Sequence, residues 1–464
     1  MKILLIVPDN GSYISTFPLG IGYIAAALRE RGDEVEIYNK DVYHFSAEHL
    51  TRFLDTHEFD IIGTGTCGGY YQYREMKSIA AAINKSRTKA KFVVGGHLVT
   101  PEPEYFLKLL NADYIVLGEG EETMKELVSR LEANQAVDST LKGLAYKDEN
   151  GKCYVNERRD QIKDIDSIPF PAWDLFPMDH YTLLRMPHIN SDERCMVMYS
   201  GRGCLFHCNF CYRMDKGFRP RSTESVIQEM RILKEKYNVT YIAFFDELLV
   251  SSVQRVTEFC EKLIASGLNM KWDCNGRLNF ANPDMLKLMK KAGCVFINYG
   301  IESMDDEALK RMNKNLTTKQ VIEGIENTLA AGISPGYNII FGNIGEDEKS
   351  LQMGVDFLLK YDDHSQLRTI RPVTPYPGCP LYYYAIEKGL LKDVEDFYEH
   401  KHVNSDLLAV NFTPLTDDEF YKCLREANKA LLTNYYDDLK EKAIKMEEKL
   451  YDDRDASFRG FRQT

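Results

Sequence analysis

The chain has 464 residues, a formal net charge of −12, 44% hydrophobic residues and 28% charged residues. Its length predicts two or three domains, and its composition is that of an ordinary globular protein. The acidic balance, together with the lack of any Lys/Arg-rich stretch, argues against a protein that tracks nucleic-acid phosphates.

The first apolar run of the sequence, residues 1–7, is too short for a signal peptide and is broken by Pro8. No apolar run approaches the length of a membrane span. Eleven cysteines without an export signal indicate a reducing compartment. We therefore expect a cytoplasmic protein without a membrane span, whose cysteines are thiols and metal ligands.

Short apolar runs alternate with amphipathic stretches over the first 131 residues. This alternation predicts an α/β domain, a doubly wound Rossmann-like parallel sheet with helices on both faces. Strands are expected at 2–7, 34–38, 59–63, 91–94 and 114–117, with helices such as 19–30 and 76–84 between them. Ligands of such sheets bind at the carboxyl ends of the strands, where polar or glycine-rich turns occur at 8–11, 63–69, 95–97 and 118–121.

A hairpin and a proline-rich linker are expected next, because Asn150-Gly151 is a strong turn signal and Pro169 and Pro171 exclude regular structure. Six further strands are expected at 195–200, 241–245, 271–275, 295–300, 336–341 and 367–374. The helices between them include 224–237, 253–266, 283–292 and 319–331. Six units are too few to close an eight-stranded barrel. Beyond 386 the chain becomes helical and charged, with a flap expected at 397–413 and a surface helix at 417–452.

Three cysteines, Cys204, Cys208 and Cys211, have the spacing C-x-x-x-C-x-x-C. Three thiolates on one loop can hold three irons of an iron–sulfur cube, and the missing fourth cysteine leaves one iron open. The alternative is a zinc knuckle with His207 or a distant cysteine as fourth ligand. Zinc sites usually have two separated ligand pairs, and the sequence has no second C-x-x-C and no H-x-x-x-H.

This spacing, with the aromatic residues Phe210 and Tyr212 beside the last cysteine, resembles the signature of the radical S-adenosylmethionine (SAM) superfamily. The resemblance implies a 4Fe–4S cluster on the three cysteines and a SAM molecule that chelates the open iron. It also implies that the six strand–helix units form a partial (β/α)6 TIM barrel. SAM-binding residues implied by the family motifs are Phe210, Tyr212, Asp246, Arg277, Gly300, Glu302, Ser303, Asn338 and Phe341. Helix capping is the alternative for Asp246.

The first domain resembles the cobalamin-binding domain that precedes the cluster in one large branch of these enzymes. The stretch 17–28 and the turn Gly118-Glu119-Gly120-Glu121 are typical of that branch. The resemblance implies that a corrin ring and its nucleotide tail lie on the carboxyl edge of the sheet. The cobalamin-binding residues that it implies are Asp9, Asn10, Thr64, Thr66, Cys67, Tyr70, Gly95, Gly96, His97, Gly118, Glu119 and Gly120.

One departure from the pattern concerns the lower ligand of cobalt. Cobalamin carriers place D-x-H-x-x-G after the first strand, and its histidine ligates cobalt, but the turn at 9–11 has no histidine. We therefore expect no histidine from this motif on cobalt, and the loop 64–71 would meet the lower face. The residues nearest the metal would be Thr66, Cys67 or Tyr70. A packing role is the alternative for Cys67, and an ordinary surface position is the alternative for His97.

The resemblance implies a cobalamin-dependent radical SAM C-methyltransferase, which methylates an unactivated carbon by way of a 5′-deoxyadenosyl radical and methylcobalamin. The alternatives are cyclisation or rearrangement without methyl transfer, a regulator without turnover, and a radical enzyme whose first domain is empty. Expected partners are a small-molecule, peptide or protein substrate and an electron donor such as flavodoxin or ferredoxin. The expected regions are a cobalamin domain (1–140), a linker (141–190), a partial barrel (191–385) and a helical substrate-facing region (386–464).

Overall fold

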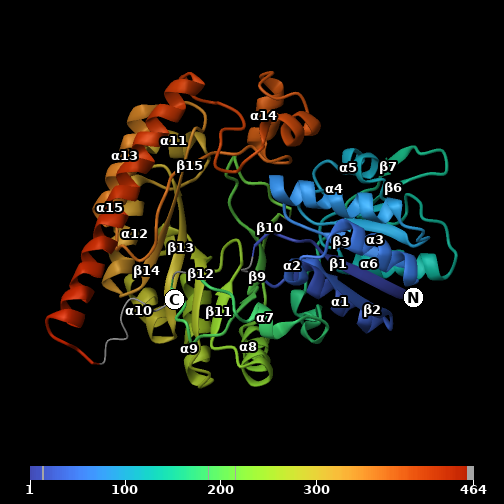
Figure 1. Ribbon diagram of the computed structural model, residues 1–464, viewed down its shortest axis with the longest axis horizontal. Coiled ribbons are helices and arrows are strands. Elements are labelled where there is room, and N and C mark those ends of the chain that lie inside the picture. Colours follow the sequence, from blue (N-terminus) through green and yellow to red (C-terminus); the bar gives the residue numbers. More distant parts are fainter. Residues whose placement is uncertain (13–14, 187, 215, 457–464) are drawn as a thin grey trace.

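The computed structural model describes residues 1–12, 15–186, 188–214 and 216–456. Two largely parallel sheets form the body of the molecule, and a small antiparallel hairpin lies between them (Figure 1). Within the described residues, no helix is both long and apolar enough to cross a membrane.

The first sheet has seven strands in the order β2-β1-β3-β4-β5-β6-β7. Both faces of its centre are covered, since Ile3 and Leu5 of β1 belong to one hydrophobic cluster and Leu4 and Ile6 to the other. The expected doubly wound sheet is thereby confirmed. Its parallel strands are β1 (Lys2–Val7), β2 (Glu34–Asn39), β3 (Ile61–Gly65), β4 (Lys91–Gly95) and β5 (Tyr114–Val116).

The hairpin expected in the linker extends this sheet. Its strands β6 (Leu144–Lys147) and β7 (Cys153–Val155) pair antiparallel, and β6 pairs with β5. On one face of the sheet lie α1 (Leu19–Arg31) and α6 (Glu121–Glu132). Helices of the other face are α3 (Ala47–Thr56), α4 (Tyr70–Lys85) and α5 (Pro103–Leu110), and the short α2 (Lys40–Tyr43) follows β2.

The second sheet has six parallel strands in the order β15-β14-β13-β12-β11-β8. Among the described residues β15 and β8 do not pair with each other, and β8 forms only an isolated bridge from Cys195 to Leu183 on its outer side, so the partial barrel is open. This confirms the expected architecture. The strands are β8 (Cys195–Met198), β11 (Tyr241–Phe244), β12 (Lys271–Gly276), β13 (Cys294–Glu302), β14 (Ser334–Phe341) and β15 (Arg371–Pro372). Its helices are α8 (Thr223–Tyr237), α9 (Val253–Ala265), α10 (Pro283–Lys291), α11 (Asp306–Arg311), α12 (Thr318–Ala330) and α13 (Glu348–Tyr361).

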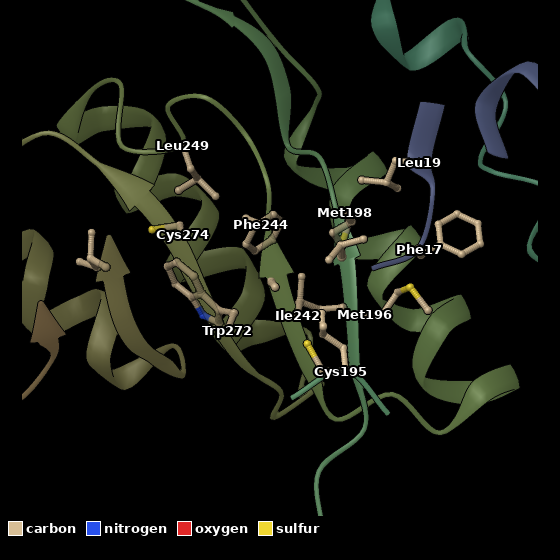
Figure 2. Close-up of a cluster of buried hydrophobic side chains, with 14 of the residues drawn as sticks. Phe17, Leu19, Cys195, Met196, Met198, Ile242, Phe244, Leu249, Trp272 and Cys274 are labelled. Carbon is tan, nitrogen blue, oxygen red and sulfur yellow. The ribbon is translucent and has the colours of Figure 1, made fainter. Parts of the chain in front are cut away.

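One continuous hydrophobic cluster joins the two halves of the molecule. Figure 2 shows Phe17 and Leu19, which lead into α1, beside Met196 and Met198 of β8. The remaining short elements between the sheets are the 3₁₀ turns η1 (Ile165–Ser167) and η2 (Trp173–Leu175) and the helix α7 (Met178–Tyr181). A further 3₁₀ turn, η3 (Leu278–Phe280), follows β12. The halves are therefore held together by apolar packing as well as by the linker.

The hairpin β9 (Gly201–Cys204) and β10 (Gly217–Pro220) was not expected from the sequence. Its strands, Gly-Arg-Gly-Cys and Gly-Phe-Arg-Pro, have no apolar alternation that would indicate a strand. Gly203 has φ +85°, and a Cβ there would lie 2.2 Å from the carbonyl oxygen of Gly217. Only glycine fits this position.

The C-terminal region is helical, with α14 (Pro380–Glu387), a π-helical turn (Asp396–Lys401) and α15 (Asp417–Tyr451). The first half of α15 is not the surface helix that we expected. Phe420, Leu424, Ala427 and Leu431 are buried, because this half packs against α13 at the outer edge of the barrel (Figure 1). Tyr398, from the expected flap, stacks on Tyr73 of α4 with ring centroids 4.5 Å apart.

Candidate active site

The three cysteines lie on the loop that leaves the hairpin at Cys204, near the carboxyl end of the barrel strands. Asn209, between the second and third cysteine, anchors this loop from three sides. Its N–H donates to the carbonyl of Met312 (2.9 Å), and its carbonyl accepts from Leu381 N–H (2.9 Å). Its side-chain amide exchanges two hydrogen bonds with that of Asn343, at 3.1 and 3.0 Å. The loop is therefore held in one conformation.

The thiols form a coupled group beside two cations. The Cys211 thiol donates a hydrogen bond to the sulfur of Cys208, which lowers the pKa of Cys208 and raises that of Cys211. The positive charges of Lys314 and Arg277 lower the pKa of Cys208 further. This electrostatic setting favours the thiolate, the form that binds metal, at Cys208, whereas burial raises the pKa of Cys204.

A single metal ion and an iron–sulfur cluster need different arrangements of these thiols. In the described part of the chain, no three His, Cys, Asp or Glu side chains are spaced to hold one metal ion. A cluster needs one thiolate for each of three irons. Three thiols on one anchored loop match that donor set.

The family motif Gly300-Ile301-Glu302-Ser303 lies directly against the cysteine loop. Glu302 ends β13 with φ +73°, and its carboxylate forms a buried ion pair with Lys314 at 2.8 Å. The ammonium of Lys314 lies 5.9 Å from the ring centroid of Phe210. A Cβ at Gly300 would lie 2.5 Å from the Glu302 carboxylate, so this glycine makes the approach possible.

Sequence reasoning missed Lys314. It follows the short helix α11, where no periodicity or motif spacing marks a functional lysine. Only the folded structure shows that its ammonium lies beside Glu302 and Phe210. A buried lysine is unusual unless it is paired.

Arg277 follows β12 and lies with its guanidinium 3.5 Å from the ring centroid of Phe206. One of its nitrogens donates to the carbonyl of Asn315 (3.2 Å). Its Nε is buried and has no hydrogen-bond partner among the described residues. Burial lowers the pKa of Arg277, although the nearby cysteine sulfurs oppose this shift. An incoming carboxylate would satisfy the orphaned N–H, so the site fits the carboxylate end of SAM.

Asparagine side chains form a ladder across the inner face of the barrel. Asn338 on β14 donates to Asn298 on β13 (2.9 Å), and Asn298 donates to Asn275 on β12 (3.0 Å). Asn275 in turn donates to the carbonyl of Asp246 (2.8 Å). A Cβ at Gly336 would lie 2.5 Å from the Asn298 oxygen, so this glycine leaves room for the ladder. The exposed end of the ladder is Asn338, the residue expected near SAM.

The side chains of two expected SAM-binding residues do not line this inner face. The carboxylate of Asp246 is 1% exposed, accepts from Ser200 N–H (2.6 Å) and from the Ser200 hydroxyl, and has its pKa raised by burial. Phe341 points to the outside of the barrel, where it stacks on Phe420 at 4.8 Å. The alternation of side chains along β14 explains this, since Asn338 points inward and Phe341, three residues later, must point outward.

The turns expected to hold cobalamin meet at the carboxyl edge of the first sheet. A Cβ at Gly65 would lie 3.0 Å from the Gly95 oxygen, and a Cβ at Gly96, which has φ +92°, would lie 2.6 Å from the Thr66 oxygen. These turns therefore pack backbone against backbone. The hydroxyl of Thr64 points back into the sheet, where it donates to the Ile6 carbonyl (3.0 Å).

The first turn at this edge is built around Asp9. Its carboxylate accepts from Gly11 N–H (2.6 Å) and lies 2.9 Å from Nδ1 of His44, which follows α2. The side chain of Asn10 donates to Asp41 (3.1 Å). The turn contains no histidine of its own, as expected, and it is fixed by α2.

The loop after β3 carries Cys67. Cys67 is solvent-exposed, although the surrounding protein raises the pKa of its thiol by desolvation. It interacts electrostatically with Tyr199, which follows β8. Tyr70 is instead directed to Arg74 and to His402 of the C-terminal region, with ring centroids of Tyr70 and His402 6.5 Å apart.

The two groups of expected cofactor residues are in direct contact. The ring of Tyr212, which follows the last cysteine, contacts the ring of His97 edge-on, with the two ring centroids 5.9 Å apart. Tyr212 is therefore turned toward the first domain, and not toward the inner face of the barrel where SAM was expected. Glu119, expected at cobalamin, has its carboxylate occupied by Arg202 and Arg219 at 2.8 Å each. Its neighbour Gly118 has φ +74°, and a Cβ at Gly120 would lie 2.8 Å from Ile24.

Comparison with known proteins agrees with this geometry. Residues 198–358 match the model of the radical SAM superfamily, and residues 13–128 match the B12 binding domain. An uncharacterized methyltransferase of Pyrococcus horikoshii, PH0819, is 32% identical over 439 residues, which are 92% of this chain and 91% of that protein. The chain belongs to the radical SAM enzymes that carry a B12-binding domain. Its cofactors are accordingly a 4Fe–4S cluster, SAM and cobalamin.

Two further likenesses place this radical SAM enzyme among its relatives. The structure of TsrM from Kitasatospora setae, a radical SAM methyltransferase with cobalamin and a 4Fe–4S cluster bound, superposes with a TM-score of 0.74. At 16% identity, over 93% of this chain and 90% of that one, this likeness shows the fold. An anaerobic magnesium-protoporphyrin IX monomethyl ester cyclase of Rubrivivax gelatinosus is 26% identical over 417 residues, 87% of this chain and 73% of the cyclase.

Proposed function

We propose that the enzyme is a C-methyltransferase that methylates an unactivated carbon of its substrate. The observation that carries the proposal is the contact between Tyr212 of the cysteine loop and His97 of the turn after β4, since it brings together residues expected at the two cofactors. A methyltransferase name on the relative with 32% identity supports it. When bound, SAM on the reduced cluster supplies a 5′-deoxyadenosyl radical and methylcobalamin supplies the methyl group.

In this proposal the residues of the barrel hold and orient the reactants. Cys204, Cys208 and Cys211 would bind three irons of the cluster, and the hydrogen bonds of Asn209 would hold their loop in place. Arg277, with its orphaned Nε, and Lys314 would receive the carboxylate of SAM. Such positioning of groups is the main contribution of a protein whose cofactors carry out the chemistry.

Residues of the first domain have a matching role in the proposal. Gly95 and Gly96 would let the nucleotide tail of cobalamin approach the backbone, and His97 would contact that tail. Cys67 would lie nearest the lower face of cobalt, because its side chain is exposed whereas Tyr70 packs on His402. The surrounding protein raises the pKa of the Cys67 thiol by desolvation, so this residue would present a neutral thiol, a poor metal ligand, to the cofactor.

The substrate, a small molecule, peptide or protein, would enter between Cys67 and the asparagine ladder. A one-electron donor such as flavodoxin or ferredoxin would reduce the cluster, and the exposed side chain of Leu205, next to Cys204, marks a side open to it. Cytoplasmic location follows from the need for a reducing compartment. Cyclisation without methyl transfer is the second candidate, which the 26% identity to the Rubrivivax gelatinosus cyclase favours.

Analysis of SAM products separates the two candidates. The anaerobic enzyme, loaded with iron, sulfide and cobalamin, is incubated with a reductant, SAM carrying a deuterated methyl group, and a fractionated cell extract. Methyl transfer predicts S-adenosylhomocysteine together with 5′-deoxyadenosine, and a product that has gained the deuterated methyl group. 5′-Deoxyadenosine without S-adenosylhomocysteine would refute methyl transfer. The Cys204→Ala variant controls for background cleavage.

A further inference from the structure

Four charged side chains form a clasp where the two halves of the molecule meet. We use this name for Glu119, in the turn before α6, and Glu121, the first residue of α6, together with Arg202 and Arg219 of the β9–β10 hairpin. Arg202 donates to Glu119 at 2.8 Å and to Glu121 at 2.6 Å. Arg219 donates to both oxygens of Glu119, at 3.0 and 2.8 Å. All four side chains are at most 18% exposed, so these are largely desolvated ion pairs.

The two glutamate carboxylates compensate a repulsion between like charges within the hairpin. Arg202 and Arg219 are direct partners in the β9–β10 register, and like charges that face one another across strands repel. A two-stranded hairpin is also only marginally stable by itself. The glutamates of the first domain neutralise this pair, and Tyr23 of α1 lies 5.2 Å from the Arg202 guanidinium. The conformation of the hairpin is therefore coupled to the first domain.

The same hairpin carries the first cysteine. Cys204 is the last residue of β9, two residues beyond Arg202, and the intervening Gly203 is held against the Gly217 carbonyl. Glu119 also accepts from the linker, at Ile162 N–H (2.9 Å). One carboxylate thus connects the cobalamin-side turn, the linker and the base of the cluster loop.

We propose that Glu119, Glu121, Arg202 and Arg219 are positioning residues that set the placement of the cluster loop relative to the cobalamin-binding turns. One buried hydrophobic cluster, which includes Phe17 and Leu19 as well as Met196 and Met198, already joins the two halves, so we expect them to stay together without the clasp (Figure 2). The ion pairs of Arg202 and Arg219 with the two glutamates connect the first domain to the hairpin that carries Cys204, so the orientation of Cys204 is the effect that we expect of them. The inference needs both cofactors bound side by side, and it holds for methylation and cyclisation alike.

The test measures the distance between the two metal centres. Glu119→Gln leaves the two arginines facing one another with one carboxylate between them. Arg219→Lys is the milder change, because it keeps the charge but replaces the planar guanidinium, whose Nη1 contacts both oxygens of Glu119, by a compact ammonium. Glu122→Gln is the matched control, since Glu122 is adjacent in sequence but pairs with Lys125 at 2.6 Å on the surface. Each protein is loaded with iron, sulfide and cobalamin, and metal content is measured first.

Pulsed electron paramagnetic resonance then reads the dipolar coupling between cob(II)alamin and the reduced cluster. We expect wild type and Glu122→Gln to give one narrow distance distribution, and the clasp variants to give a shifted or broadened one at unchanged iron and cobalt content. An unchanged distribution in both clasp variants would overturn the proposal. Loss of metal from both would overturn it too, because the clasp would then maintain the fold and not the spacing. The readout needs no turnover, so a failed methylation assay leaves it unaffected.

Discussion

The buried Glu302–Lys314 pair provides a sharp energetic test of the site. Its two side chains are 9% and 8% exposed, and the charged atoms lie 2.8 Å apart. Replacing Lys314 by methionine leaves the Glu302 carboxylate buried without its counter-charge. Breaking a buried pair from one side costs about 3–5 kcal/mol, whereas removing both charges is often nearly neutral. We therefore expect Lys314→Met to destabilise the cofactor-free protein by that amount and Lys314→Met/Glu302→Gln to recover most of the loss.

Equilibrium urea unfolding measures this difference, because the midpoint shifts by the lost free energy divided by the m-value. Trp272 of β12 is fully buried and is one of only two tryptophans, so a Trp173→Phe background reports the barrel alone. The matched control is Lys442→Met, whose pair with Asp438 lies on the surface of α15 and, being screened by solvent, should contribute little to stability. If Lys314→Met lost no more stability than this control, the pair would not be the desolvated contact described here.

Three further predictions concern the hairpin, the clasp and the last helix. Gly203→Ala would place a Cβ 2.2 Å from the Gly217 oxygen, so it should lower the iron content and spare cobalamin binding. Gly217→Ala shares the strain of a positive φ (+75° against +85°) but has open space around its Cβ, so it should keep more of its iron; equal iron content in both variants would contradict this. Burial opposes the charged form of Glu119, but the hydrogen bonds and charges of Arg219 and Arg202 outweigh this effect and lower its pKa in the folded protein. The charged carboxylate therefore stabilises the fold at pH values above its unfolded-state pKa. This contribution is lost as the pH falls through the folded-state pKa. The melting temperature should therefore fall more steeply on acidification in wild type than in Glu119→Gln, and parallel curves would refute this. Phe420→Ala should cost about 3–5 kcal/mol and expose α15 to limited proteolysis, whereas Tyr421→Ala, 38% exposed in wild type, should leave the digestion pattern unchanged.

The sequence was sufficient for the regular parts of both sheets. Strand β1 has the bounds expected from its apolar run, and the six barrel strands occur in the expected order, because hydrophobic periodicity and strand–helix alternation are local signals. The cysteine spacing was likewise a local signal. Its three thiols do share one anchored loop.

What the sequence could not provide depends on contacts between distant residues. The partners in the clasp are 81 to 100 residues apart, and nothing near Glu119 indicates that arginines will occupy its carboxylate. Lys314 has no local signal either. The sequence named Phe341 as a SAM-binding residue but did not show that its ring would stack on Phe420 of α15, 79 residues further along the chain. The first half of α15 is buried because it packs against α13, which is distant in the sequence.

Metal analysis of the anaerobic protein tests the central claim most directly. Wild type supplied with iron, sulfide and cobalamin is compared with the triple variant Cys204→Ala/Cys208→Ala/Cys211→Ala, and ultraviolet–visible spectra are recorded beside the metal content. The account predicts about four irons and about one cobalt per chain in wild type, and loss of iron with retention of cobalt in the variant. Iron without cobalt in wild type would contradict the two-cofactor site and remove methylcobalamin from the proposed reaction.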